Sequence, residues 1–333
     1  MTSRVSRSFT RAIGGLFSPS GLDARLVVFC YHQVLEARDE LHPDEPDRTE
    51  FTRDIETIGS VFNVLKLDEA IRRLSQGTLP ARAACITFDD GYANNHEVAA
   101  PVLEAAGVPA TFFVAAGAVD TGIMWNDLVV EAISRRRSTF VLDGGDELAE
   151  RLGSLTPGWD LALSILNMLK YLPLDVRWAR AERIYRANVD GEPPRLMMTR
   201  EMVADLAGRG FDIGGHTVSH PILKELDNQR AQLEIESCSR WIADVTGVRP
   251  TSFAYPNGRP GKDFDASHEA MVEAAGFTLA VSTEWALAGR GSNVFAIPRV
   301  GPWWRQNRTM VGGTARAYMS DYIRRRLKVK RAH

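Results

Sequence analysis

The fold is decided by a stretch in the first third of the chain, which reads Ile86-Thr87-Phe88-Asp89-Asp90-Gly91-Tyr92. It ends a mainly apolar run from Ala83 to Phe88, a pattern that is typical of a strand buried in a parallel sheet. In a regular strand neighbouring side chains point to opposite faces, so Asp89 and Asp90 could not serve one site there. At the strand end, Gly91 frees the backbone, and both carboxylates can turn into one pocket at the mouth of an α/β sheet.

A pair of histidines, His216 and His220, follows much later in the chain, after Gly214-Gly215. Two imidazoles at this spacing can converge on one metal ion. One carboxylate and two imidazoles leave a coordination position open for water, which is the arrangement of a catalytic zinc. This mixture of nitrogen and oxygen ligands suits Zn²⁺ best, while Co²⁺, Ni²⁺ and Fe²⁺ remain open. The second carboxylate is then free to act as a base.

Together, the two stretches resemble the first two motifs of the polysaccharide deacetylases, carbohydrate esterase family 4. The similarity of pattern extends from about Val27 to Val300. It implies a distorted (β/α) barrel that uses a divalent metal to remove N-acetyl groups from an amino-sugar polysaccharide or glycan intermediate. The residue roles that it implies are Asp89 as the general base and Asp90, His216 and His220 as the metal ligands.

The run from Ser252 to Gly258 resembles a third motif of the family, although the arginine that commonly precedes its aromatic residue is absent. Pro256-Asn257-Gly258 is strong turn chemistry, so a strand that simply ends in a turn is one interpretation. The functional interpretation uses the same turn to aim the backbone N–H of Tyr255 at the developing oxyanion.

The acid that protonates the leaving amine is the largest departure from the family pattern. Many members supply it from a Leu-x-His motif near the C-terminus, where this chain has Ile297-Pro298-Arg299. His32, directly after the first apolar run, resembles the early general acid of the biofilm poly-N-acetylglucosamine deacetylase branch. A barrel brings all strand ends to one rim, so we predict His32 as the acid. A histidine that only bonds backbone at a strand end is the alternative. We predict that Arg299 pairs with Asp89 and holds it ionised.

Strands alternate with helices along the chain, which predicts a mostly parallel α/β architecture. We expect an N-terminal arm over 1–24, a barrel over 25–310 with a helical insertion at 120–195, and a basic helix or tail over 311–333. Predicted strands span 26–31, 83–88, 110–115, 139–142, 211–215, 251–255, 278–281 and 295–300. Predicted helices span 50–62, 94–106, 125–137, 159–171, 174–188, 202–208, 229–246 and 269–275, with one more from Asp68.

Composition and charge exclude several other classes of protein. The 333 residues are 44% hydrophobic and 25% charged, with a net charge of −2, which gives no general attraction to nucleic acid. The basic run over 324–331 is either a solvated helix end or a contact with anionic membrane lipid. We see neither a signal-peptide core nor a membrane span, so we expect a cytoplasmic protein, with peripheral contact to the inner membrane left open. Cys30, Cys85 and Cys238 are expected to be buried and reduced.

Three functions fit these observations. The favoured one is an N-deacetylase acting on an N-acetylated glycan, in exopolysaccharide or cell-envelope biosynthesis. A hydrolase of amides or cyclic imides on the same scaffold is the second, and a non-catalytic, metal-containing glycan-binding protein is the third. Tryptophans are the candidate platforms for a sugar ring, although most tryptophans are simply packed; the candidates are Trp125, Trp285, Trp303 and Trp304.

Overall fold

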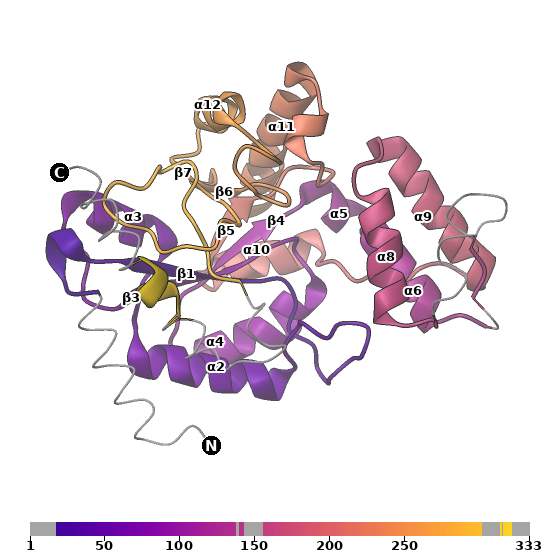
Figure 1. Cartoon of the computed structure of the whole chain (residues 1–333), viewed down its shortest axis with the longest axis horizontal. Helices are drawn as coiled ribbons and strands as arrows, with labels where there is room; N and C mark the ends of the chain where they lie inside the picture. The colour runs from indigo at the N-terminus through magenta and orange to yellow at the C-terminus, as the bar shows by residue number, and fades with distance from the viewer. Residues whose placement is uncertain (1–17, 138–139, 143–155, 302–313, 315, 322–333) are drawn as a thin grey trace.

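The computed structural model describes residues 18–137, 140–142, 156–301, 314 and 316–321. Seven parallel strands form one curled sheet in the order β1-β3-β4-β5-β6-β7, with β2 beside β3 (Figure 1). This confirms the predicted α/β class and the distorted barrel. The strands are β1 (Leu26–Tyr31), β2 (Asn63–Val64), β3 (Ala83–Phe88), β4 (Thr111–Val114), β5 (Asp212–Gly215), β6 (Ser252–Ala254) and β7 (Leu279–Val281).

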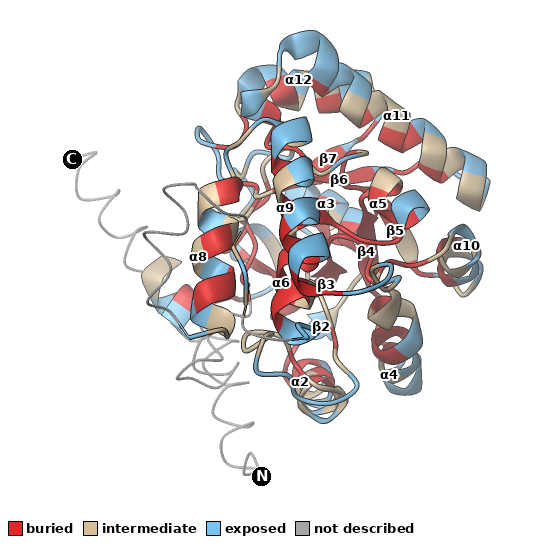
Figure 2. Cartoon of the chain, turned by 90° about the vertical axis from the view of Figure 1, so that its right-hand side faces the viewer, coloured by how far each residue is buried: buried red, intermediate tan, exposed pale blue. Residues whose placement is uncertain are grey.

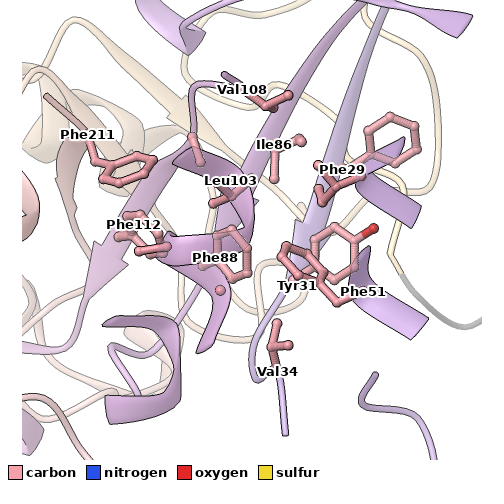
Figure 3. Close-up of a cluster of buried hydrophobic side chains, with 14 of the residues drawn as sticks. Phe29, Tyr31, Val34, Phe51, Ile86, Phe88, Leu103, Val108, Phe112 and Phe211 are labelled. Carbon is pink, nitrogen blue, oxygen red and sulfur yellow. The ribbon is translucent and has the colours of Figure 1, made fainter. Parts of the chain in front are cut away.

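Successive side chains along β1 and β3 point to opposite faces of the sheet. Phe29 and Phe88 point outward into the largest core, where the ring of Phe88 stacks on Phe112 at 4.8 Å and helices α2 and α4 contribute Phe51 and Leu103 (Figure 3). Side chains on the other register of β1 and β3 lie inside the barrel, packed with α3. The inner register of β3 runs through Thr87 and therefore leads directly to the predicted base.

The helices of the barrel cover the sheet on its outside, apart from α3, which packs on the inner cluster. Each begins or ends where the sequence supplies a cap: Asp47 forms a capping box with Glu50 at the start of α2, and Gly77 ends α3 with φ of 70°. The bounds are α2 (Arg48–Val61), α3 (Leu67–Gln76), α4 (Ala100–Ala106, after a π-helical turn at Asn95–Ala99), α5 (Ala116–Thr121), α10 (Arg200–Gly208), α11 (Asn228–Thr246) and α12 (Ala266–Ala274).

The predicted helical insertion is present as α6 (Trp125–Ser134), α8 (Trp159–Leu169) and α9 (Leu174–Asn188). These helices lie at one side of the sheet and bury an apolar cluster of their own (Figures 1 and 2). The insertion is joined to the strand-end motif, because the hydroxyl of Tyr92 donates to Asp127 of α6 at 2.9 Å. Burial raises the pKa of Asp127 to about 7.

Two predicted strands are wrong. Residues 140–142 are irregular, and the other predicted residue of that strand, 139, lies outside the described part of the chain. Residues 295–300 form only isolated bridges, from Ile297 to Val281 of β7 and from Val300 to Phe29 of β1. Pro298 lies between them and has no N–H to donate, so a regular ladder cannot form. This segment closes the gap between the last and first strands.

Some predictions concern residues that the structure does not describe: most of the N-terminal arm, the basic run 324–331, Trp303 and Trp304. Of the helices in the described ranges, none is both long enough and apolar enough to cross a membrane. The three cysteines are buried and free, as predicted.

Candidate active site

The two carboxylates lie where β3 ends, and backbone conformation brings them to one site. Asp90 has a left-handed φ of 76° and Gly91 a φ of 93°. That conformation is uncommon for a residue with a side chain, and such residues concentrate at functional sites. Asp89 continues the inner register of β3, while the turn redirects Asp90 from the outer face. The sharp turn is what allows two neighbouring residues to serve one pocket.

The histidine loop follows β5 and is held by its own hydrogen bonds. His220 has a φ of 54°, and its N–H donates to the hydroxyl of Thr217 at 3.1 Å. The carboxylate of Glu234, on α11, accepts from the backbone N–H groups of Val218 at 2.8 Å and of Ser219 at 2.9 Å. Sequence reasoning missed Glu234, because nothing in a long amphipathic helix marks which residue clamps a distant loop.

The predicted ligand set comes together. Asp90 Oδ1 lies 3.3 Å from Nε2 of His216 and 3.4 Å from Nε2 of His220. Ligand atoms bound tetrahedrally about 2.1 Å from a zinc ion lie about 3.4 Å apart, so the carboxylate oxygen already has the separation from each imidazole nitrogen that a metal requires. The distances exceed those of ordinary charge-assisted hydrogen bonds, which are about 2.7–2.9 Å. These three residues therefore fit a divalent metal.

Neighbouring groups set the orientation and charge of the ligands. His216 Nδ1 lies 2.7 Å from the carbonyl oxygen of Ala254, which accepts its proton and leaves Nε2 as the ligand atom. Burial lowers the pKa of His220 to about 3, so its imidazole is neutral at pH 7. Burial opposes ionisation of Asp90, yet the surrounding imidazoles, that of His216 first, outweigh burial and lower its pKa. A neutral imidazole and an ionised carboxylate are the forms that bind metal.

Asp89 forms the predicted pair with Arg299. The guanidinium donates to both carboxylate oxygens at 2.7 Å each, and to the carbonyl of Ser282 at 2.9 Å. Both side chains are buried, at 1% and 4% exposure. Burial alone would raise the pKa of Asp89, but the charge and hydrogen bonds of Arg299 outweigh it and lower the pKa. Arg299 lies in the irregular segment 295–300, which closes the barrel and places the guanidinium beside Asp89.

Replacing Arg299 by methionine is expected to destabilise the fold by about 3–5 kcal/mol, because the carboxylate of Asp89 is then buried without its partner. Urea unfolding at pH 7 measures the loss. The native pair lowers the pKa of Asp89 below its usual 3.8. Its contribution is therefore fully present above that value and is lost as the pH falls through the folded-state pKa. The matched control is the double variant with Asp89→Asn, which should recover part of the loss; equal instability of both variants would contradict the account.

His32 lies at the end of β1, on the same rim as the two carboxylates. Its side chain is 34% exposed, and Nδ1 is 4.0 Å from a carboxylate oxygen of Glu45, in the loop between β1 and α2. One ligand-type atom from each of His32, Cys30 and Asp89 falls within 4.8 Å of the others. Burial raises the pKa of the Cys30 thiol, which stays protonated and lies 3.7 Å from Asp89. This second group is thus a poor metal set, and His32 stays available for proton transfer.

Tyr255 is not placed as predicted. Its N–H donates to the carbonyl of Val281 in β7 at 3.4 Å, and its ring is buried against Phe264, with centroids 3.7 Å apart. Asn257, two residues on and with φ of 59°, is the residue of this turn that lines the site. The geometry does not support Tyr255 as the oxyanion donor, because its N–H is directed into the sheet.

The two carboxylates, the two histidine ligands and His32 border one groove of about 690 Å³. The described residues that line it are His32, Asp89, Asp90, Asn167, Lys170, Tyr171, His216, His220, Asn257, Arg259, Lys262 and Thr283. Three of them, Asn167, Lys170 and Tyr171, come from the helical insertion at the end of α8. Their part in the groove was not predicted, because it depends on how the insertion packs and not on any local pattern.

The two candidate tryptophans within the described residues, Trp125 and Trp285, are poor sugar platforms. Trp125 is 8% exposed, and the guanidinium carbon of Arg177 lies 4.8 Å from its ring centroid. It lines a smaller apolar pocket of about 300 Å³ beside His220. Trp285 is half-buried and packs against the main core.

Comparison with known proteins shows the family of the chain. The family model described as polysaccharide deacetylase matches residues 76–280, more than half of the chain. YxkH of Bacillus subtilis (strain 168), named as a polysaccharide deacetylase, is 21% identical over 300 residues, which are 90% of this chain and 77% of YxkH. Among solved structures, the Streptococcus pyogenes deacetylase PplD in complex with acetate has a TM-score of 0.56 at 16% identity, covering 84% of this chain and 92% of PplD.

IcaB from Ammonifex degensii has a TM-score of 0.54 at 19% identity, covering 90% of this chain and 98% of IcaB. At such identities the structural likeness shows the fold alone, and the fold is the distorted barrel described above. The sequence match extends over both the aspartate pair and the histidine pair. The chain belongs to the polysaccharide deacetylase family.

Proposed function

We propose that this protein is a metal-dependent hydrolase that removes N-acetyl groups from an amino-sugar polysaccharide or glycan intermediate, with zinc as its metal. One observation carries the proposal: a carboxylate kept ionised by a buried arginine stands directly beside a three-ligand metal set, at the floor of an open groove. The ligands leave room for water and substrate, as catalytic zinc sites do.

The roles of the side chains follow from their positions. A divalent metal held by Asp90, His216 and His220 would polarise the acetamide carbonyl and lower the pKa of water. Asp89 accepts the proton that water loses as its oxygen attacks the carbonyl carbon. The acetamide C–N bond then breaks, the acetyl group leaves as acetate, and the amine nitrogen must take up a proton.

His32 is the proposed donor of that proton. It lines the groove on the same rim as Asp89, it is partly open to solvent, and the carboxylate of Glu45 faces its other side. Among the described residues that line the groove, the remaining histidines are the two proposed metal ligands. The early position of this acid is the feature that resembles the biofilm deacetylase branch.

Replacing His32 by alanine is expected to cripple N-deacetylation while a much larger fraction of activity on an activated acetate ester survives. An amine leaves poorly without a proton, whereas the alkoxide of an activated ester leaves without help. The check is to measure kcat/KM of the variant and the wild type on an N-acetyl oligosaccharide and on the ester, and to compare the fractions of activity retained.

The control for this variant is His96→Ala. His96 pairs with Asp205 and is not part of the groove lining. It should keep both activities. Equal losses on amide and ester in His32→Ala would assign a structural role to His32, and full amide activity would assign proton delivery to another group.

The function itself is tested by the product. Acetate release from N-acetylglucosamine oligomers, compared with ring-opening of small cyclic imides, separates the proposal from an imide hydrolase. Glycan binding that requires metal but gives no turnover would mean a non-catalytic protein. Asp89→Asn supplies the background rate in both assays. The cytoplasmic location and a role in exopolysaccharide or cell-envelope biosynthesis stay predictions from the sequence.

A further inference from the structure

The helical insertion supplies one wall of the catalytic groove. Asn167 and Lys170 lie at the end of α8, and Tyr171 follows directly. Arg259 and Lys262 line the same groove and come from the loop that follows β6. The insertion and the barrel therefore meet at the edge of the active site, and the groove is complete only with both.

Three cations gather around a single ring at that meeting point. The ammonium of Lys262 lies 5.1 Å from the ring centroid of Tyr171, and that of Lys170 lies 6.0 Å from it. The guanidinium of Arg259 donates to the Tyr171 hydroxyl at 2.9 Å. Tyr171 itself is 41% exposed, so these charges stand at the open groove and not inside a core.

The balance of charge in the groove is positive. The carboxylate of Asp89 is matched by Arg299, and that of Asp90 belongs to the metal ligands. Arg259 is matched by the buried carboxylate of Asp263, at 3.2 Å.

Lys170 and Lys262 are left without a counterion. Within the described ranges, no acidic side chain lies at ion-pair distance, 4.0 Å or less, from either ammonium. Burial lowers the pKa of Lys170; repulsion from Arg259 and Lys262 adds to that lowering, and Tyr171 and the more distant Asp263 offset only part of it. Like charges held this close together repel, and a bound anion relieves the repulsion. Two uncompensated lysines beside a catalytic centre are thus suited to a negative group on the substrate.

We infer that the groove selects N-acetylated glycans that carry an anionic group near the reacting sugar, and that Lys170 and Lys262 hold this group. The inference rests on the proposed function and names the substrate class for it. The anion is a carboxylate, as in a uronic acid unit, or a phosphate, as in a glycosyl phosphate. Lysine recognises either one as a point charge and imposes no bidentate geometry.

The test uses substrate pairs that differ only in charge. One pair is an oligosaccharide of alternating N-acetylglucosamine and glucuronic acid and the same oligosaccharide with its carboxyls reduced to alcohols. The other is N-acetylglucosamine 1-phosphate and its neutral methyl glycoside. In at least one pair, kcat/KM for acetate release should be about tenfold higher for the charged member at low salt, near the upper end for two partly exposed ion pairs. The preference should shrink as ionic strength rises.

The decisive variant is Lys170→Gln combined with Lys262→Gln. The ratio of kcat/KM between the charged and neutral members should fall from about tenfold toward one, mainly through KM. Arg72→Gln is the matched control, because Arg72 is an exposed cation on α3 that does not line the groove. It should keep the wild-type ratio, since the lost charge is elsewhere.

Failure of the inference is distinct from failure of the proposed function. Acetate released equally from the charged and neutral members of both pairs overturns the inference and leaves the deacetylase intact. Should no acetate appear from any of them, calorimetric binding to Asp89→Asn decides the inference alone. The inference is supported if a charged member binds more tightly than its neutral counterpart and this difference is lost when both lysines are also replaced. Equal binding of the charged and neutral members overturns the inference.

Discussion

Asp89→Asn is expected to lower kcat for acetate release by ~10²–10⁴, the usual worth of a positioned proton acceptor. The amide keeps the shape of the carboxylate but cannot accept the proton that water loses. Metal content and KM should stay close to wild type, because Asp90 and not Asp89 lies at ligand distance from both histidines. Steady-state kinetics and metal analysis of the same preparation measure both.

The matched control is Asp90→Asn, which replaces the neighbouring carboxylate. It should lose metal and activity together. If Asp89→Asn emptied the metal site while Asp90→Asn kept it, the roles of base and ligand would have to be exchanged. The Asp89 variant also buries Arg299 beside a neutral amide, so urea unfolding must accompany the kinetics to separate a catalytic loss from a loss of folded protein.

Replacing His216 or His220 by alanine is expected to remove both bound metal and activity. Each imidazole supplies one of three ligands, and two remaining ligands hold a divalent ion far more weakly. The fold should survive, because the apolar clusters of the sheet and helices do not depend on the metal. The loss of metal is measured as metal stoichiometry by mass spectrometry. Survival of the fold is measured as a cooperative thermal transition by circular dichroism.

His96→Ala again provides the control, because it removes an imidazole outside the groove and should change neither metal content nor rate. His220→Ala is the cleaner of the two ligand variants, since His216 also bonds the carbonyl of Ala254 and is more deeply buried. One equivalent of zinc retained in both variants would sink the metal assignment.

The strands that the sequence predicted correctly are those whose signal is local. The run from Ala83 to Phe88 is buried at every residue, and so is that from Leu26 to Tyr31, so continuous apolar character was sufficient. The segment 295–300 failed because its apolar residues pack as a closing bridge between β7 and β1, and Pro298 removes a ladder donor. Helix α5 was missed, since six residues rich in alanine and glycine carry no periodic pattern.

The site was predictable to the extent that its residues occur in short motifs. Both carboxylates and both histidines lie together, and Arg299 pairs with Asp89 as expected. Tyr255 was misplaced because a turn sequence does not say which of its N–H groups faces the groove. Lys170 and Glu234 could not be found from sequence, because each reaches the site through the packing of a helix that carries no motif.

The central claim is tested most directly by titrating the metal-free protein with zinc while acetate release from an N-acetylglucosamine oligomer is measured. The account predicts a rate near zero without metal, a linear rise, and a plateau at one zinc per chain. Co²⁺ should restore part of the rate with the same stoichiometry. Full acetate release from protein that holds no metal, or none from protein that holds one zinc per chain across the charged and neutral glycans, would contradict it.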